Sequence, residues 1–249
     1  MKRLCSRLAL FAGLFCLSQT LSGKSMPIQW GTAATISSDS DVATAGTLVY
    51  AYNIGPSGTT STTVNGVTFS AFEFPPDGSE GPVSVGSLMI DQFPGFLYSA
   101  NDFGSGTPPF SGLSPSYQTL LTTGGESVGT DPVFYNNLYV TLNNLTPNQE
   151  YLVEIWVSNS AGKAGIAQVQ AAGANSVTLD SRSNSIGQYA VGTFTYGYSS
   201  GTFVVSGANQ VDIPVINAIQ LRAIPEPATW LLFGLGLFVP LAMRHRKRC

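Results

Sequence analysis

The sequence has few charged side chains, and its central part lacks the residue types that most often carry catalysis. Only 10% of the 249 residues are Asp, Glu, Lys or Arg, against about 25% in an ordinary soluble domain. The single histidine and all three cysteines lie near the two ends, as Cys5, Cys16, His245 and Cys249. A central region from Ser25 to Ala223 therefore contains neither cysteine nor histidine.

These absences exclude several classes of function. Without Cys or His, the central region cannot hold a Ser-His-Asp or Cys-His catalytic centre, and it lacks the usual ligands of zinc and copper. It carries thirteen acidic and three basic side chains, a formal charge of −10, which excludes a nucleic-acid-binding surface. Because Lys and Glu are scarce while Gly, Ser, Thr and Asn abound, coiled coils and helical bundles are excluded as well.

The central region alternates apolar and polar residues with a period of two, which predicts β-strands. Asn65-Gly66, flanked by alternating residues, predicts a tight hairpin, and Ser114 before Pro115 predicts the start of one short helix that ends at Leu121. The pattern predicts an all-β fold, an antiparallel β-sandwich of jelly-roll type, with two smaller sandwiches as the alternative. Further strands are expected over residues 47–54, 138–142, 150–158, 188–196, 202–205 and 211–221.

The first 23 residues have the pattern of a secretory signal peptide. Lys2, Arg3 and Arg7 precede an apolar stretch from Leu8 to Leu17, followed by small residues near a plausible cleavage point. The sequence therefore predicts export through the Sec machinery.

The last 26 residues form a second distinct segment. Pro225, Glu226 and Pro227 are followed by an uncharged stretch from Ala228 to Met243, which predicts a transmembrane helix of roughly 24 Å. A basic tail then holds the cytoplasmic end of that helix, and its charged residues are Arg244, Arg246, Lys247 and Arg248.

This order of motif, apolar helix and basic tail resembles the PEP-CTERM sorting signal of Gram-negative bacteria. The resemblance covers the C-terminal segment alone, with the motif on Pro225, Glu226 and Pro227. It implies a partner, exosortase, which is a membrane cysteine protease or transpeptidase that processes such chains near the motif. It also implies transient anchoring in the inner membrane, then release or transfer to the cell surface, in bacteria that often make exopolysaccharide.

Two groups of residues in the central region are candidate binding sites. Glu154 and Trp156 share one face of the strand predicted over 150–158, where an aromatic ring could stack on a sugar, and Tyr139 on the preceding strand could extend that surface. The favoured alternative places Trp156 in the core or under a loop, as for most tryptophans. Asp39 and Asp41 form a weak candidate for calcium, and a turn in which Asp bonds to its own backbone is the favoured alternative.

Taken together, these patterns predict an exported surface or matrix protein whose non-catalytic β-sandwich binds polysaccharide. No enzyme activity and no cofactor other than calcium is expected. Two alternatives stay open. One is a purely structural surface component without a ligand, and the other is a glycan hydrolase or lyase that uses a pair of carboxylates.

Overall fold

The computed structural model describes residues 26–75, 81–92, 96–100, 103, 110, 112–128, 137–163, 166, 168–209 and 212–225. The predicted signal peptide and the predicted transmembrane helix lie outside these ranges. Within them, no helix has the length and apolar character needed to cross a membrane.

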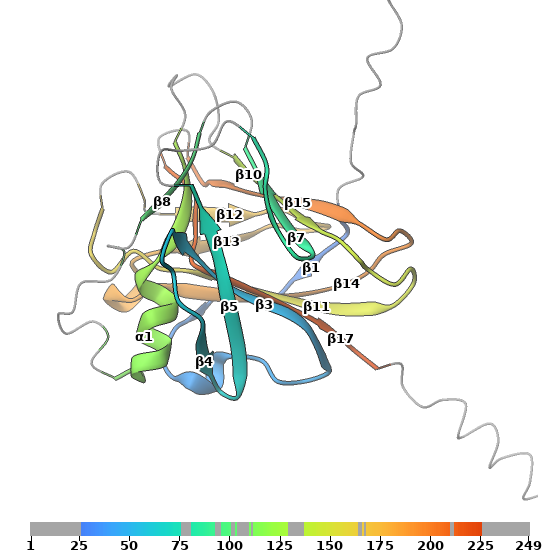
Figure 1. The fold of residues 1–249 in the computed structure, drawn as a ribbon, viewed down its shortest axis with the longest axis horizontal. Helices are drawn as coiled ribbons and strands as arrows, with labels where there is room; N and C mark the ends of the chain where they lie inside the picture. Colours follow the sequence, from blue (N-terminus) through green and yellow to red (C-terminus); the bar gives the residue numbers. More distant parts are fainter. Residues whose placement is uncertain are drawn as a thin grey trace, which may run out of the picture.

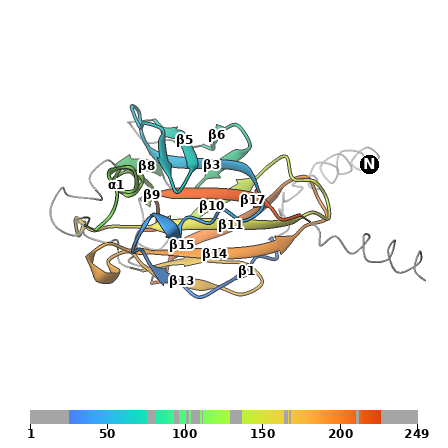
Figure 2. The ribbon, with the colours of Figure 1, turned by 90° about the horizontal axis from the view of Figure 1, so that it is seen from below.

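Most of the described chain forms two β-sheets that face each other (Figures 1 and 2). The larger sheet has the strand order β1-β14-β11-β17-β3-β5-β4, with β2 also paired to β14. Its strands are β1 (Gln29–Trp30), β2 (Ala34–Thr35), β3 (Thr47–Pro56), β4 (Thr62–Val64), β5 (Val67–Phe74), β11 (Glu150–Val157), β14 (Gln188–Thr195) and β17 (Ala218–Ala223).

The second sheet has six strands, in the order β13-β12-β15-β10-β7-β6. A small third sheet, β16-β9-β8, adds to one end of the sandwich. The strands of these two sheets are β6 (Val83–Val85), β7 (Leu88–Asp91), β8 (Phe96–Ala100), β9 (Gly124–Val128), β10 (Asn137–Leu142), β12 (Gln168–Ala171), β13 (Val177–Asp180), β15 (Gly201–Gly207) and β16 (Val215–Ile216).

The strand order matches that of a jelly roll. In the larger sheet β3, β17, β11 and β14 are consecutive neighbours, and in the second sheet β10, β15, β12 and β13 are. Followed along the chain, these eight strands cross repeatedly from one sheet to the other, as two Greek keys do. Among the described strands every pair is antiparallel except β3 and β5. The all-β, antiparallel fold expected from the sequence is therefore confirmed.

Local sequence signals explain several of these elements. The β4–β5 hairpin turns at Asn65 and Gly66, both with positive φ (49° and 75°), as expected for a turn that needs this conformation at both positions. Helix α1 (Pro115–Thr122) begins where the side chain of Ser114 accepts a hydrogen bond from the backbone N–H of Tyr117, at 3.2 Å. The predicted hairpin and helix are thus confirmed.

The middle of the larger sheet, at β11 and β17, is buried on both faces. Tyr151, Val153 and Ile155 of β11 point into the core between the sheets, where β15 contributes Phe203. On the opposite face, a second apolar cluster is covered by α1, which lies beside β4 in Figure 1. Because helix and hairpin close this outer face, β11 is buried along nearly its whole length.

The single strand predicted over residues 211–221 is instead two strands. β16 pairs with β9 in the small sheet, whereas β17 lies between β11 and β3. Asn217 separates them, and its buried side chain bonds to neighbouring backbone: Oδ1 accepts from Ser158 N at 2.6 Å, and Nδ2 donates to the carbonyls of Leu121 (3.1 Å) and Thr123 (2.8 Å). These bonds hold three segments together at the point where the chain changes sheets.

Candidate functional site

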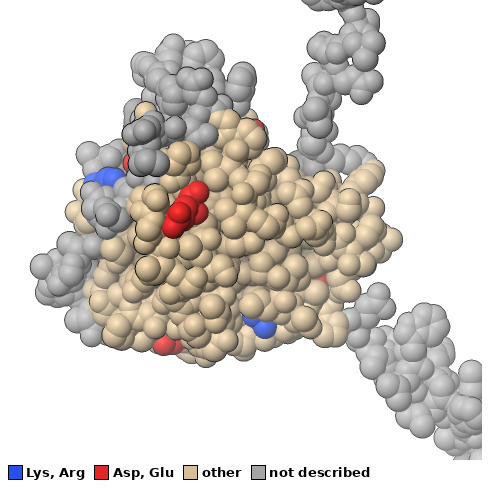
Figure 3. Space-filling view, viewed as in Figure 1, with Lys and Arg blue, Asp and Glu red and all other residues tan. Residues whose placement is uncertain are grey.

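Ionised side chains are sparse on the molecular surface. Most of the described surface visible in Figure 3 is neither acidic nor basic. Two polar clusters stand out among the described residues. One is buried around Glu154, and the other lies around Lys163 near the small third sheet.

The first cluster links β11 and β17 beneath the segment that leads into β3. Glu154 is fully buried, and its Oε2 accepts hydrogen bonds from the backbone N–H of Ala43 (3.0 Å) and from Nε2 of Gln220 (2.5 Å). The other oxygen of this carboxyl, Oε1, is buried without a partner. The carboxyl is therefore only half satisfied in an environment that water does not reach.

Arg222, two residues after Gln220 on β17, binds the backbone of residues 44–46 in the same segment. Its guanidinium donates to the carbonyls of Ala45 (2.7 Å), Thr44 (2.9 Å) and Gly46 (2.9 Å). Gly46 has a φ of 78°, and a Cβ there would lie 2.4 Å from the carbonyl oxygen of Ala223. This close approach requires glycine, so the segment is clamped against the sheet.

Burial decides the protonation of Glu154. Desolvation raises its pKa from 4.5 to about 7, while the hydrogen bonds from Ala43 and Gln220 oppose that shift. A raised pKa is typical of a general acid, but this carboxyl lies beneath the 43–46 segment and cannot touch an external substrate. The carboxyl of Glu154 can therefore bind a proton, but it cannot donate that proton to a substrate outside the protein.

Trp156 is also buried, in agreement with the alternative favoured from the sequence, so it does not form the candidate sugar-stacking surface. Its Nε1 donates to the hydroxyl of Tyr117 at 2.9 Å, and its ring meets Phe69 edge to face with centroids 5.4 Å apart. Tyr139, on β10, belongs to the other sheet, so the three predicted residues do not come together. The tryptophan fills the space under α1 because that helix and β5 close over it.

Asp39 and Asp41 form a turn rather than an open loop. The carboxylate of Asp41 accepts from the backbone N–H groups of Ser37 (2.6 Å) and Ser38 (2.9 Å) and from the hydroxyl of Ser37 (3.0 Å). This is the turn favoured over calcium in the sequence analysis. In the part of the chain that the structure describes, no three His, Cys, Asp or Glu side chains are grouped as metal ligands.

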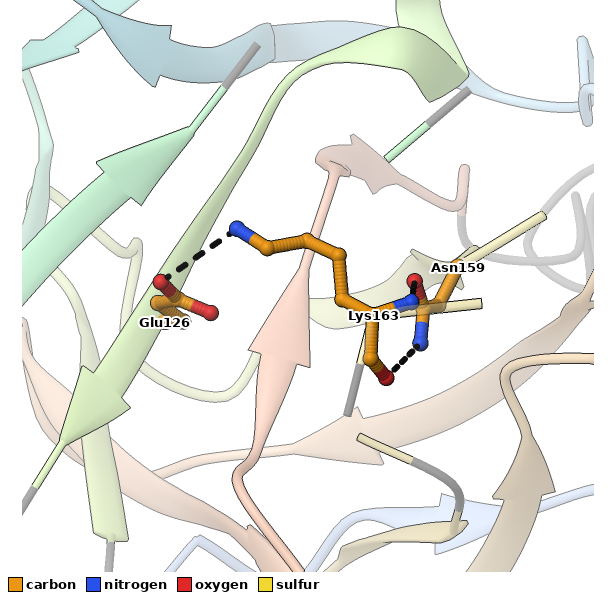
Figure 4. A network of polar contacts seen from close by, with 3 residues as sticks. All are labelled: Glu126, Asn159 and Lys163. Atoms are coloured by element: carbon orange, nitrogen blue, oxygen red, sulfur yellow. Dashed lines mark hydrogen bonds and ion pairs between the residues drawn. The ribbon is translucent and has the colours of Figure 1, made fainter. Parts of the chain in front are cut away.

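The second polar cluster surrounds Lys163, in the loop after β11 (Figure 4). Its Nζ lies 3.7 Å from Oε1 of Glu126 on β9 and 4.6 Å from the ring centroid of Phe103. The amide of Asn159 fixes the backbone of this loop, because it accepts from Lys163 N (2.9 Å) and donates to Lys163 O (3.0 Å). The sequence analysis missed this pair, although Lys163 is one of only three basic residues in the central region.

The C-terminal part of the chain carries the recognisable functional signal. Residues 223–247 match the family model described as the PEP-CTERM protein-sorting motif. The chain carries a PEP-CTERM sorting motif. This motif marks an exported protein that exosortase processes at the membrane, as the resemblance implied. No curated protein and no solved structure matches the chain.

The match to the sorting motif begins at the last residue of the final strand. Ala223 ends β17, and Ile224 remains tied to the fold because its N–H donates to the carbonyl of Glu150 at 2.9 Å. Pro225 is the last described residue, whereas Glu226, Pro227 and the basic tail lie outside the described ranges. Sandwich and sorting motif therefore follow each other without a linker.

The buried carboxyl of Glu154 predicts an unusual pH dependence of stability. Its pKa is about 7 in the folded protein against 4.5 when exposed, so the folded state binds the proton more tightly. The protonated carboxyl therefore contributes about 3 kcal/mol to the free energy of unfolding below pH 4.5. This contribution is lost as the pH rises to about 7. We expect Glu154→Gln to remove that part of the difference in unfolding free energy between pH 5 and pH 8.

Glu150→Gln is the matched control, because Glu150 lies exposed at the start of the same strand. It should leave the pH dependence as it is in the native protein. Denaturant titrations of the three proteins at both pH values measure the effect. An equal pH dependence in the native protein and in Glu154→Gln would contradict a raised pKa for this carboxyl.

Proposed function

We propose that the chain is a non-catalytic protein of the cell surface or extracellular matrix, displayed as a jelly-roll module after exosortase has processed its sorting motif. The observation that carries this proposal is the direct succession of β17 and the motif. Processing near Pro225, Glu226 and Pro227 would leave every strand of the sandwich in place.

The environments of two acidic side chains, Glu154 and Asp41, support the non-catalytic part of this proposal. A glycosidase needs two carboxyl groups on opposite sides of a bond that the substrate can reach. Glu154 has the raised pKa of an acid catalyst, yet it is fully buried and bonded to Ala43 and Gln220. The carboxylate of Asp41 is engaged by the backbone of its own turn.

Of the two non-catalytic alternatives, a structural role is favoured over polysaccharide binding. The side chain expected to stack on a sugar, Trp156, lies under α1 with its ring N–H bonded to Tyr117. A glycan array separates these alternatives, since specific binding by the purified protein would favour a polysaccharide ligand.

Processing is tested on protein isolated from its native cells. We expect its intact mass to lack the signal peptide and the segment that follows the Pro225–Pro227 motif. Replacing Pro225, Glu226 and Pro227 with alanine should leave an unprocessed precursor in the membrane fraction, because the enzyme loses its recognition motif. Arg182→Ala, which changes an exposed side chain of the sandwich, is the control and should be processed normally. A native mass that still includes Arg244 to Cys249 would contradict the proposal.

A further inference from the structure

Exposed large apolar side chains are rare in this protein, and they gather at one end. Among the described residues they are Leu48, Val49 and Tyr198, which are 37%, 40% and 53% exposed. Single exposed apolar residues need no explanation. The position of all three near the point where the chain leaves the sandwich does need an explanation.

Leu48 and Val49 lie beside the last strand. In the pairing of β17 with β3, Leu221 faces Tyr50 and Arg222 faces Leu48, so that Val49 is an extra residue on β3. Such a β-bulge turns side chains out of the regular alternation. Both apolar side chains are consequently exposed, and they lie beside Arg222, the residue before the end of β17.

Tyr198 lies on the other side of the same exit point. It belongs to the loop between β14 and β15, and β14 pairs with β11 through Thr195 and Glu150. The carbonyl of Glu150 accepts the N–H of Ile224. Across the end of the sheet, the order is therefore the β14 loop, β11, the departing chain and β3, and both ribbon views place these segments together (Figures 1 and 2).

This end of the sandwich is also nearly free of charge. Residues 46–49, 86–87, 143–149 and 196–200 include no Asp, Glu, Lys or Arg. Glu150 begins β11 at this end, Glu226 follows in the departing chain, and the guanidinium of Arg222 is turned inward onto backbone carbonyls. An end with few charges and with exposed apolar and tyrosine side chains is compatible with the boundary between lipid headgroups and hydrocarbon, where tyrosine is enriched.

The length of chain beyond the fold limits how far this end can stand from the membrane. Ile224 is held by the sheet, and only Pro225, Glu226 and Pro227 separate it from the apolar stretch that begins at Ala228. The four Cα–Cα steps from Ile224 to Ala228 span at most about 14 Å, and the polar layer on each side of a bilayer is about 5–7 Å thick. An anchored precursor therefore keeps this end within about 9 Å of the lipid headgroups.

We infer that the end of the sandwich carrying Leu48, Val49 and Tyr198 rests in the interface of the lipid bilayer as long as the precursor is anchored. The contact orients the module with its exit point on the membrane. Processing of the motif cuts the tether, and three exposed side chains alone then bind lipid too weakly to retain the module. This inference rests on the proposed function, because it requires the C-terminal segment to insert into a membrane.

Site-specific fluorescence on the full chain tests the contact. Cys5, Cys16 and Cys249 are replaced with serine, and a single cysteine is introduced as Leu48→Cys, Tyr198→Cys or Ser57→Cys and labelled with an environment-sensitive dye. Ser57 is exposed just beyond the opposite end of β3, so it is the matched control. The labelled proteins are reconstituted into phosphatidylethanolamine–phosphatidylglycerol vesicles that contain a nitroxide-labelled lipid.

We expect the dye at positions 48 and 198 to be quenched at least about twofold more strongly than at position 57, since interfacial groups lie within the reach of lipid-bound nitroxides. Vesicle flotation is measured on the same samples. Protein that floats but is quenched equally at all three positions, or strongly at only one of 48 and 198, would overturn the contact while leaving the anchor intact. Protein that fails to float would overturn the anchor and, with it, the proposed sorting route. Melting curves confirm the fold of each variant, and Val49→Cys replaces Leu48→Cys where that variant does not fold.

Discussion

Trp156→Ala is expected to lower the free energy of unfolding by about 3–5 kcal/mol, the usual cost of removing a large buried aromatic side chain. The indole is fully buried under α1, packed against Phe69 and bonded to Tyr117. For a domain of this size such a loss lowers the melting temperature by roughly 6–20 °C. Thermal unfolding followed by circular dichroism measures the shift.

Two further variants show whether the loss comes from packing at this position. Trp156→Phe keeps an aromatic ring against Phe69 but leaves the buried hydroxyl of Tyr117 without its donor, so its cost should be about 1–3 kcal/mol. Tyr139→Ala removes a half-buried ring from the other sheet and should cost less than Trp156→Ala. A melting temperature of Trp156→Ala equal to that of the native protein would mean that the indole is not part of the core.

Asn217→Ala is expected to destabilise the protein by at least about 3 kcal/mol, because it leaves one buried N–H and two carbonyls without their partner, each at about 1–3 kcal/mol. The groups affected belong to Ser158, Leu121 and Thr123. Equilibrium unfolding in denaturant measures this change, together with the slope that reports exposed surface.

Asn175→Ala is the matched control for Asn217→Ala. Asn175 also bonds to backbone at two points, the N–H (2.7 Å) and the carbonyl (2.8 Å) of Trp30. Its side chain is exposed, however, so water can replace the lost amide and the cost should be well below that of Asn217→Ala. Equal losses in both variants would show that the burial of Asn217 does not matter.

Local signals in the sequence predicted much of the secondary structure. The Asn65-Gly66 turn and the Ser114 cap depend on backbone preferences of a few neighbouring residues, and the structure confirms both. The two faces of β11 also follow from alternation alone, since Tyr151 points into the core between the sheets and Trp156 points away from it.

Non-local contacts decided what the sequence could not predict. Alternation assigned Trp156 to the outer face of β11, but α1 and β5, distant in sequence, determine that this face is covered. Likewise, the polar Asn217 interrupts the apolar face of residues 211–221, but only its bonds to Ser158, Leu121 and Thr123 show that the strand breaks there. The raised pKa of Glu154 results from burial by residues 43–46, which no spacing in β11 indicates.

The central place of β17 in the larger sheet has a consequence for when the protein can fold. β17 is the last of the described strands, yet it joins β3 to β11 by hydrogen bonds on both sides. Until residues up to Ala223 have crossed the inner membrane, β3 and β11 each lack this neighbour, and such long-range pairing is slow to form. The sandwich can therefore complete its fold only after residues up to Ala223 have emerged, when the adjoining sorting motif reaches the membrane.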